Sequence, residues 1–203
     1  MTPALIQLLE KGIDDAGLFP PEQLELKEAL ARHRRLVSGP EKWIVNRFVC
    51  PAARLEAMGE DLLRYEEEPI FSITVIGRGG STLDEFQSNL DLDAVAVAEF
   101  NRKLDGVAEV ESFETRLPMG DALPRALKYL LQFEGIELYG ELSWGEDLMD
   151  SLVVMAEIEE VAAKGRTGGV TAEAFPSTEK LAEFLQGCAN LDLPFKLTAG
   201  LHH

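Results

Sequence analysis

Two lysines near the end of the chain have surroundings that could make one of them a reactive amine. Lys164 lies in the segment 163–168 and Lys196 in the segment 195–200, and both segments are short, rich in apolar and small residues, and end at glycine. Burial and a second cation both disfavour the charged form of a lysine, so its free amine can attack a carbonyl carbon. The pair indicates Schiff-base chemistry, unless one or both lysines point outward or pair with the abundant carboxylates.

The segment between the two lysines has the period of an α-helix. Its apolar residues fall at i, i+3, i+4 and i+7, and they are Leu181, Phe184, Leu185 and Cys188. Ser177, directly after Pro176, is a suitable N-cap for this helix. The stretch 162–203 is therefore predicted to form a strand, a helix and a second strand, with one lysine on each strand.

The rest of the chain repeats this alternation. Strands are expected to begin near residues 43, 70, 107, 136, 161 and 194, with a short further strand at 12–16. Each gap holds at least one helical pattern, and 82–90 and 91–104 read as two separate helices. Strands joined by helices are parallel, which predicts an α/β fold, either a barrel or a doubly wound sheet. Polar residues with glycine or proline at the strand ends favour the TIM-type (β/α) barrel, whose active face lies there.

If 12–16 is the first strand, Lys164 lies on strand 6 and Lys196 on strand 7. We therefore expect one domain over residues 1–203, a barrel truncated before its last βα unit. A strand at the open edge of such a barrel exposes backbone N–H and C=O groups that have no partner strand. A second copy of the chain, or another chain, is expected to cover that open edge, so the protein could be a homo-oligomer.

The two lysine segments resemble the lysine strands of the class I deoxyribose-phosphate aldolases. That family carries its Schiff-base lysine in a K-x-x-T-G strand, as in 164–168 here, and a second lysine on the following strand, as in 195–200. The resemblance implies that Lys164 is the nucleophile and Lys196 the partner that lowers its pKa, with Glu114 a candidate for the acidic proton-relay residue. Arg166 is bulky where the family has a small residue, and the family's phosphate-binding glycines on the last strand have no counterpart.

Nearly the whole chain also resembles a group of bacterial proteins of unassigned activity. The shared pieces are 15–21, 47–52, 168–176 and 195–203. Members of that group continue beyond the position of His203, which supports truncation. This second resemblance implies no activity.

Four arginines at or near strand ends could bind an anionic substrate: Arg47, Arg78, Arg116 and Arg166. Glycines beside them, at 77–80 and at Gly168 and Gly169, could let backbone N–H groups approach the same anion. The other interpretation is a structural layer in which these arginines pair with Glu111, Glu114 and Glu141. The residue types do not separate the two.

Histidine and cysteine give weaker signals. His202 is a candidate metal ligand, but adjacent residues of a strand point to opposite faces, so His202 and His203 would not share a site without a kink. No H-x-H, H-x-x-x-H or C-x-x-C spacing occurs, which argues against zinc. Cys50 and Cys188 lie far apart and are expected to be buried, reduced thiols rather than a disulfide framework.

Composition excludes several classes of partner. The formal net charge is −17, and binding to a phosphate backbone depends on clustered lysine and arginine, so no nucleic acid is expected. The basic cluster 32–35 ends a predicted helix, where it can complement the helix dipole. No stretch is long and apolar enough for a membrane span, and the first residues lack the features of a signal peptide, so a cytoplasmic location without membrane contact is expected.

These observations support a lyase of the aldolase type, acting on a small anionic carbonyl compound without a cofactor. One alternative is a binding or self-associating module without chemistry, for which an assembly in solution would be evidence. A further alternative is a metal-dependent lyase or isomerase that uses His202 with Glu114 and Glu141, for which bound metal would be evidence.

Overall fold

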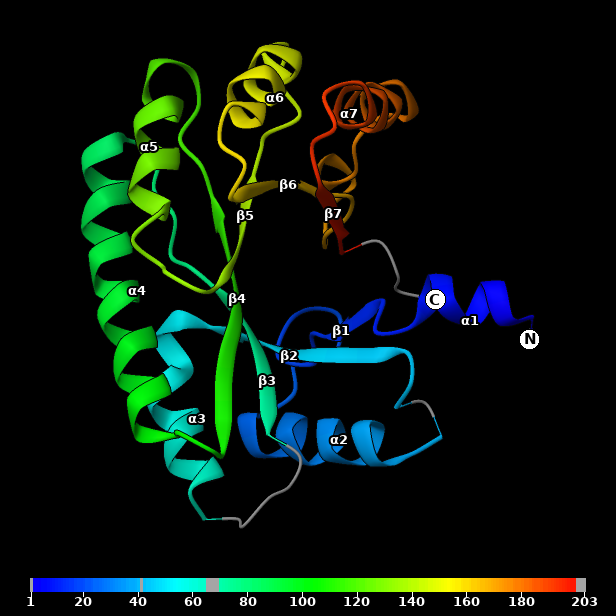
Figure 1. The fold of residues 1–203 in the computed structure, drawn as a ribbon, viewed down its shortest axis with the longest axis vertical. Helices are drawn as coiled ribbons and strands as arrows, with labels where there is room; N and C mark the ends of the chain where they lie inside the picture. The colour runs from blue at the N-terminus through cyan, green and yellow to red at the C-terminus, as the bar shows by residue number, and fades with distance from the viewer. Residues whose placement is uncertain (1, 41, 65–69, 200–203) are drawn as a thin grey trace. The chain divides into compact units, whose positions relative to one another are not determined.

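The computed structural model describes residues 2–40, 42–64 and 70–199 of the chain (Figure 1). Strands and helices alternate along it. The strands are β1 (Ile13–Asp15), β2 (Val45–Pro51), β3 (Phe71–Ile76), β4 (Ala108–Arg116), β5 (Glu137–Glu141), β6 (Val161–Arg166) and β7 (Phe195–Thr198). The helices are α1 (Pro3–Leu9), α2 (Leu26–Ser38), α3 (Leu55–Leu62), α4 (Leu83–Lys103), α5 (Leu123–Leu130), α6 (Leu148–Ala156) and α7 (Thr178–Asn190).

The strand order confirms the predicted fold class. The strands lie in the order β1-β2-β3-β4-β5-β6-β7, so each strand follows its neighbour in the sequence. This is the order of a TIM-type (β/α) barrel, whereas a doubly wound sheet reverses direction part-way. The part of the chain that the structure describes holds seven such strands, and a closed barrel of this type has eight.

The chain divides into two compact units, residues 1–76 with 96–111 and residues 77–95 with 112–203. In the first unit, β1, β2 and β3 pair in parallel and α2 lies beside β2 (Figure 1). The ring of His33 on α2 packs between Phe48 and Phe71, with ring centroids 5.4 and 4.8 Å away. Aromatic packing therefore fixes α2 on these strands.

The second unit contains the four-strand segment that carries both lysines. Its neighbouring strands from Ser112 to Thr198 pair in parallel, and α6 packs against both α5 and α7 (Figure 1). At Gly187 on α7 an added Cβ would lie 2.7 Å from Cδ1 of Leu152 on α6, so α6 and α7 approach closely here. Ser177 caps α7 as predicted, since its side chain accepts a hydrogen bond from the backbone N–H of Lys180 at 3.2 Å.

One expected helix boundary was wrong. Residues 82–104 were predicted as two helices, but α4 is one continuous helix from Leu83 to Lys103. Its buried residues recur with a helical period through the expected break, and they are Phe86, Leu90, Asp93, Val97 and Phe100. The segment before α2 turns, and the backbone N–H groups of Phe19 and Leu24 donate to the carbonyl oxygens of Ala16 and Gly17.

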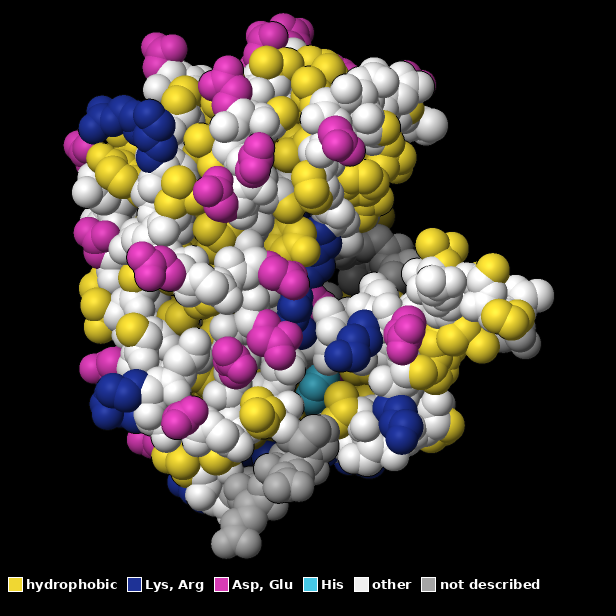
Figure 2. Space-filling model, viewed as in Figure 1, with side chains coloured by type: hydrophobic (Ala, Val, Ile, Leu, Met, Phe, Trp, Pro, Cys, Tyr) yellow, Lys and Arg dark blue, Asp and Glu magenta, His cyan; other side chains and the backbone are white. Residues whose placement is uncertain are grey.

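Acidic side chains are spread over the face seen in Figure 2, as the net charge of −17 requires. Within the described ranges, none of the helices combines the length and the apolar character that a membrane crossing needs.

Candidate functional site

Four charged residues form one row across β4, β5, β6 and β7. Arg116 is paired in register with Glu141, Glu141 with Lys164, and Lys164 with Lys196. Residues paired in this way on parallel strands point to the same face of the sheet. The strands thus bring together residues that are 25, 23 and 32 positions apart in sequence. The row lies toward the carboxyl ends of β4, β5 and β6, the side on which (β/α) barrels build their active sites.

Glu114 joins the two lysines. It lies two residues before Arg116, so its side chain points to the same face of β4. Its Oε2 is 2.7 Å from Nζ of Lys164, and its Oε1 is 2.7 Å from Nζ of Lys196. One carboxylate therefore binds both ammonium groups, each through a short charge-assisted contact.

A second carboxylate completes the contacts of Lys164. Oε2 of Glu141 lies 3.0 Å from Nζ of Lys164. The side chains of Lys164 and Glu114 are 7% and 2% exposed, whereas that of Glu141 is 17% exposed. Removing these charges from water costs more than packing apolar residues in the same space would. Both lysines therefore pair with carboxylates, which is the structural alternative that the sequence left open.

Lys196 lies closer to solvent. Its side chain is 23% exposed, and its Nζ is 5.4 Å from the ring centroid of Tyr139, within reach of a cation–π interaction. The row and Glu114 together hold three cations and two carboxylates, a net charge of +1. In a chain with a net charge of −17, these five side chains are a local excess of positive charge.

Arg116 and Arg166 extend the site toward the strand ends. Arg166 lies two residues beyond Lys164 on β6, so it points to the same face, and its Nε donates to the carbonyl oxygen of Gly168 at 3.0 Å. Both arginines are exposed. Among the described residues, no hydrogen bond or ion pair engages the guanidinium of Arg116. Arg116 therefore presents its donors to solvent.

Arg78 and Arg47 are each held by a carboxylate. The backbone N–H of Arg78 donates to Oδ2 of the buried Asp93 at 2.8 Å, and its guanidinium pairs with the other oxygen. Arg47 belongs to the first unit, where its Nε donates to Oε2 of Glu111 at 2.8 Å. Burial would raise the pKa of Glu111, but hydrogen bonds from Ser72 and Arg47 lower it overall. The expected place of Arg47 beside the other arginines stays a prediction.

The loop after β6 is tied to the end of β7. The backbone N–H and the hydroxyl of Thr167 both donate to the carbonyl oxygen of Thr198, at 2.8 and 3.0 Å. At Gly168 an added Cβ would lie 2.1 Å from the carbonyl oxygen of Ala199, so a side chain does not fit there. At Gly169 an added Cβ would lie 2.6 Å from the Cβ of Ala174. Both glycines are thus accounted for by close packing, and their expected role toward an anion stays a prediction.

The cysteines and His202, the other candidate site residues, are not part of the row. Both cysteines are buried free thiols, and burial raises the pKa of Cys50 to about 12 and that of Cys188 to about 11. His202 lies outside the described residues. Over the ranges that the structure describes, no three His, Cys, Asp or Glu side chains are grouped to hold a metal ion.

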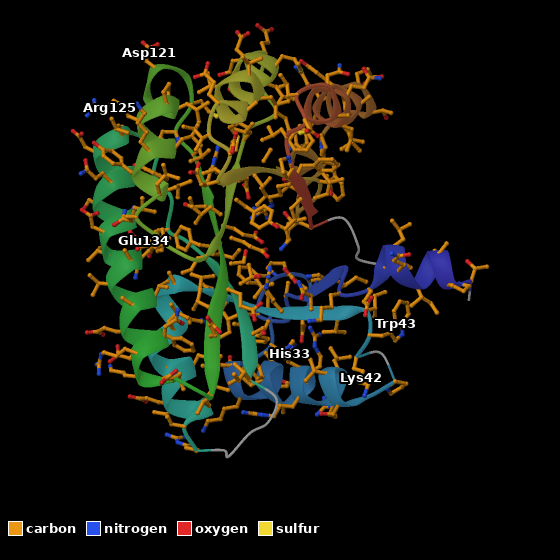
Figure 3. All side chains as sticks on the ribbon, in the orientation of Figure 1. His33, Lys42, Trp43, Asp121, Arg125 and Glu134 are labelled. Atoms are coloured by element: carbon orange, nitrogen blue, oxygen red, sulfur yellow. The ribbon has the colours of Figure 1, made fainter. Side chains whose placement is uncertain are left out.

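Two arrangements were not found from the sequence. Glu141 was considered as a structural partner or a metal ligand, and its contact with Lys164 depends on the strand register. In the first unit the buried Asp15 binds Arg32 and the backbone N–H of Gly17, and its Oδ2 lies 3.2 Å from Nδ1 of His33. His33 points from α2 toward the strands (Figure 3). The only signal for this second cluster was a histidine on an apolar helix face.

The resemblance to class I deoxyribose-phosphate aldolases rests on 164–168 and 195–200, of which Gly200 lies outside the described residues. The structure places the lysines of both segments in one row. Comparison of the chain with protein-family models, with curated proteins and with solved structures finds no match.

Proposed function

We propose that the protein is a lyase of the class I aldolase type that binds a small anionic carbonyl compound as a Schiff base on Lys164. The observation that carries this proposal is the bridge from Glu114 to Lys164 and Lys196, at 2.7 Å to each nitrogen. This bridge places a candidate amine nucleophile and a neighbouring cation side by side, two of the groups that Schiff-base chemistry uses.

Lys164 is the nucleophile in this proposal because it is the more buried of the two lysines. Two carboxylates contact its nitrogen, at 2.7 and 3.0 Å, and these opposite charges favour its ammonium form, so a proton must leave Nζ before the amine attacks. Its side chain is 7% exposed, against 23% for Lys196, so bulk water competes less with a substrate at Lys164. Lys196 then acts as the cation that remains bound to Glu114 and disfavours a second positive charge nearby.

An anionic group on the substrate fits the net positive charge of the row. Arg116 offers an open guanidinium fork on the same face, two strands from Lys164. Such a fork binds a carboxylate or phosphate through two parallel hydrogen bonds. A carbonyl carbon at Nζ of Lys164 and an anionic group at Arg116 or Arg166 define the class of substrate that we propose.

Reductive trapping tests this proposal. The protein is mixed with glyoxylate, pyruvate or glyceraldehyde 3-phosphate, borohydride is added, and the intact mass is measured. We expect a stoichiometric adduct in the wild type and none in Lys164→Arg. Lys128→Arg, which alters an exposed lysine of α5, is the matched control and should form the adduct like the wild type. Equal trapping in Lys164→Arg and in the control would contradict the proposal.

A second candidate is a module that binds a partner or its own copy through β7. The observation that favours it is the exposure of Phe195 and Leu197, at 44% and 41%, on a strand that ends the sheet order. Phe195 also lines a shallow hollow, together with Leu193 and Pro194. Sedimentation of the wild type and of Phe195→Ser/Leu197→Ser tests self-association: a wild-type dimer that the double variant abolishes supports binding to a second copy, and a wild-type monomer contradicts it.

A further inference from the structure

We infer that Glu141, rather than Glu114, is the acid–base group that moves protons between Lys164 and the substrate oxygen. This inference rests on the proposed function and deepens it. It follows from a difference between two carboxylates that both touch Lys164. Glu114 binds a lysine with each of its oxygens, whereas the contact of Glu141 with Lys164 uses Oε2 alone.

The two carboxylates differ in how readily they can take a proton. Both oxygens of Glu114 contact an ammonium group, at 2.7 Å each. When Lys164 gives up its proton, Oε1 of Glu114 still contacts Lys196, whereas the contact of Glu141 with Lys164 uses Oε2 alone. A proton that leaves Nζ of Lys164 is therefore better accommodated on Glu141.

The two carboxylates also differ in access to a substrate. The side chain of Glu114 is 2% exposed and that of Glu141 is 17% exposed. Glu141 is the last residue of β5 and is paired in register with Arg116, whose guanidinium is open to an anionic ligand. A carbonyl compound that reaches Lys164 from the strand ends would thus meet Glu141 before Glu114.

The proton transfers balance through one cycle of imine formation. Nζ of Lys164 gives a proton to Glu141, and the neutral amine attacks the carbonyl carbon, whose π electron pair moves to oxygen. A proton passes from nitrogen to that oxygen and leaves a neutral carbinolamine. Glu141 then protonates the hydroxyl, the C–O bond breaks, water leaves, and the nitrogen lone pair forms the iminium double bond. Glu141 ends as a carboxylate, and one ammonium and one carbonyl have become one iminium and one water.

Rapid-quench trapping measures this role. Each protein is mixed with pyruvate or glyoxylate, borohydride is added at intervals, and the growth of the Lys164 adduct gives the rate of imine formation. We expect Glu141→Gln to slow that rate by about 100-fold or more, as the loss of a general acid–base group does. Glu134→Gln, which alters an exposed carboxylate between α5 and β5 (Figure 3), should keep the wild-type rate.

Chemical rescue separates proton transfer from a structural role. In Glu141→Ala, added formate should restore the rate in proportion to its concentration, because it supplies the missing carboxyl group. If Glu141→Gln does not fold, Glu141→Asp, which keeps the carboxyl group, and the formate series on Glu141→Ala decide the question. A rate in Glu141→Gln within about twofold of the Glu134→Gln control, or no response to formate, would overturn the inference alone. A wild type that forms no adduct on Lys164 would overturn the proposed function as well.

Discussion

Lys164 and Lys196 are direct partners in the pairing of β6 with β7, and their ammonium groups share one carboxylate. The oxygens of Glu114 divide between them, each at 2.7 Å. A single carboxylate thus lies between two ammonium groups, on the face of the sheet that also carries Glu141 and Arg116. This arrangement supports the proposed Schiff-base site, and it makes the stability of the second unit depend on Glu114.

Replacing Glu114 should destabilise the fold. Glu114→Leu removes the shared acceptor and leaves the ammonium of Lys164, 7% exposed, beside a second cation. Breaking a buried ion pair by removing one partner costs about 3 kcal/mol or more. We expect that loss in the free energy of unfolding measured with urea, against no more than about 0.5 kcal/mol for Glu134→Leu at an exposed position. Equal stabilities of the two variants would show that the bridge contributes nothing.

Arg116 should select anionic substrates. Among the described residues, none binds its guanidinium in competition with an incoming anion, so Arg116→Gln removes a ligand contact with little structural consequence. A hydrogen bond to a charged group contributes about 1.5–3 kcal/mol, or roughly tenfold to 100-fold in affinity. We expect the half-saturating concentration of pyruvate in the trapping assay to rise by that factor, while that of neutral acetone stays unchanged.

The matched control for Arg116 is Arg125→Gln, at an exposed arginine of α5 (Figure 3). It removes the same charge from the same unit and should leave both half-saturating concentrations as in the wild type. A parallel rise for pyruvate and acetone in Arg116→Gln would contradict a role in charge recognition.

The sequence predicted the fold because its signals there are local. Apolar runs at 70–76 and 136–142 and the helical stripe 181–188 each report an element by itself, and regular alternation then implies parallel order. The site depends on strand register, which no local pattern encodes. A shift by one residue would send Glu141 to the other face of β5, away from Lys164. Lys164 and Lys196 were therefore recognisable as a pair, whereas the contacts of Glu114 with both lysines and of Glu141 with Lys164 follow from the register of the strands.

Because of Asp15, the stability of the first unit should depend on pH only in the acidic range. Burial would raise the pKa of Asp15, but hydrogen bonds involving His33 and Arg32 hold it below its ordinary value of 3.8. A carboxylate with a lowered pKa in the folded state stabilises the protein above its unfolded-state pKa, and that stability is lost as the pH falls through the folded-state pKa. Asp15→Asn should therefore lower the free energy of unfolding by about 2 kcal/mol at pH 7.

Urea unfolding of the wild type and Asp15→Asn at a series of pH values measures this effect. The difference between them should be the same at pH 7 and pH 5, and it should shrink only below about pH 4, the ordinary range of an aspartate in an unfolded chain. If the difference in unfolding free energy already shrinks between pH 7 and pH 5, its pH dependence comes from His33 and not from Asp15.

The two cysteines should resist alkylation in the native protein. Burial raises the pKa of Cys50 to about 12 and that of Cys188 to about 11, and the thiolate is the reactive form. At pH 8, iodoacetamide should label neither residue in the folded protein and both in urea, as peptide mass mapping would show. Fast labelling of Cys50 in the folded state would contradict its burial at 0% exposure.

The position of the trapped adduct tests the central claim most directly. After pyruvate and borohydride treatment of the wild type, proteolysis and mass spectrometry locate the modified lysine. We expect the added mass on Lys164 alone, because the contacts with Glu114 and Glu141 converge on its nitrogen. An adduct on Lys196, or one spread over exposed lysines such as Lys128, would contradict the assignment of Lys164 as the nucleophile.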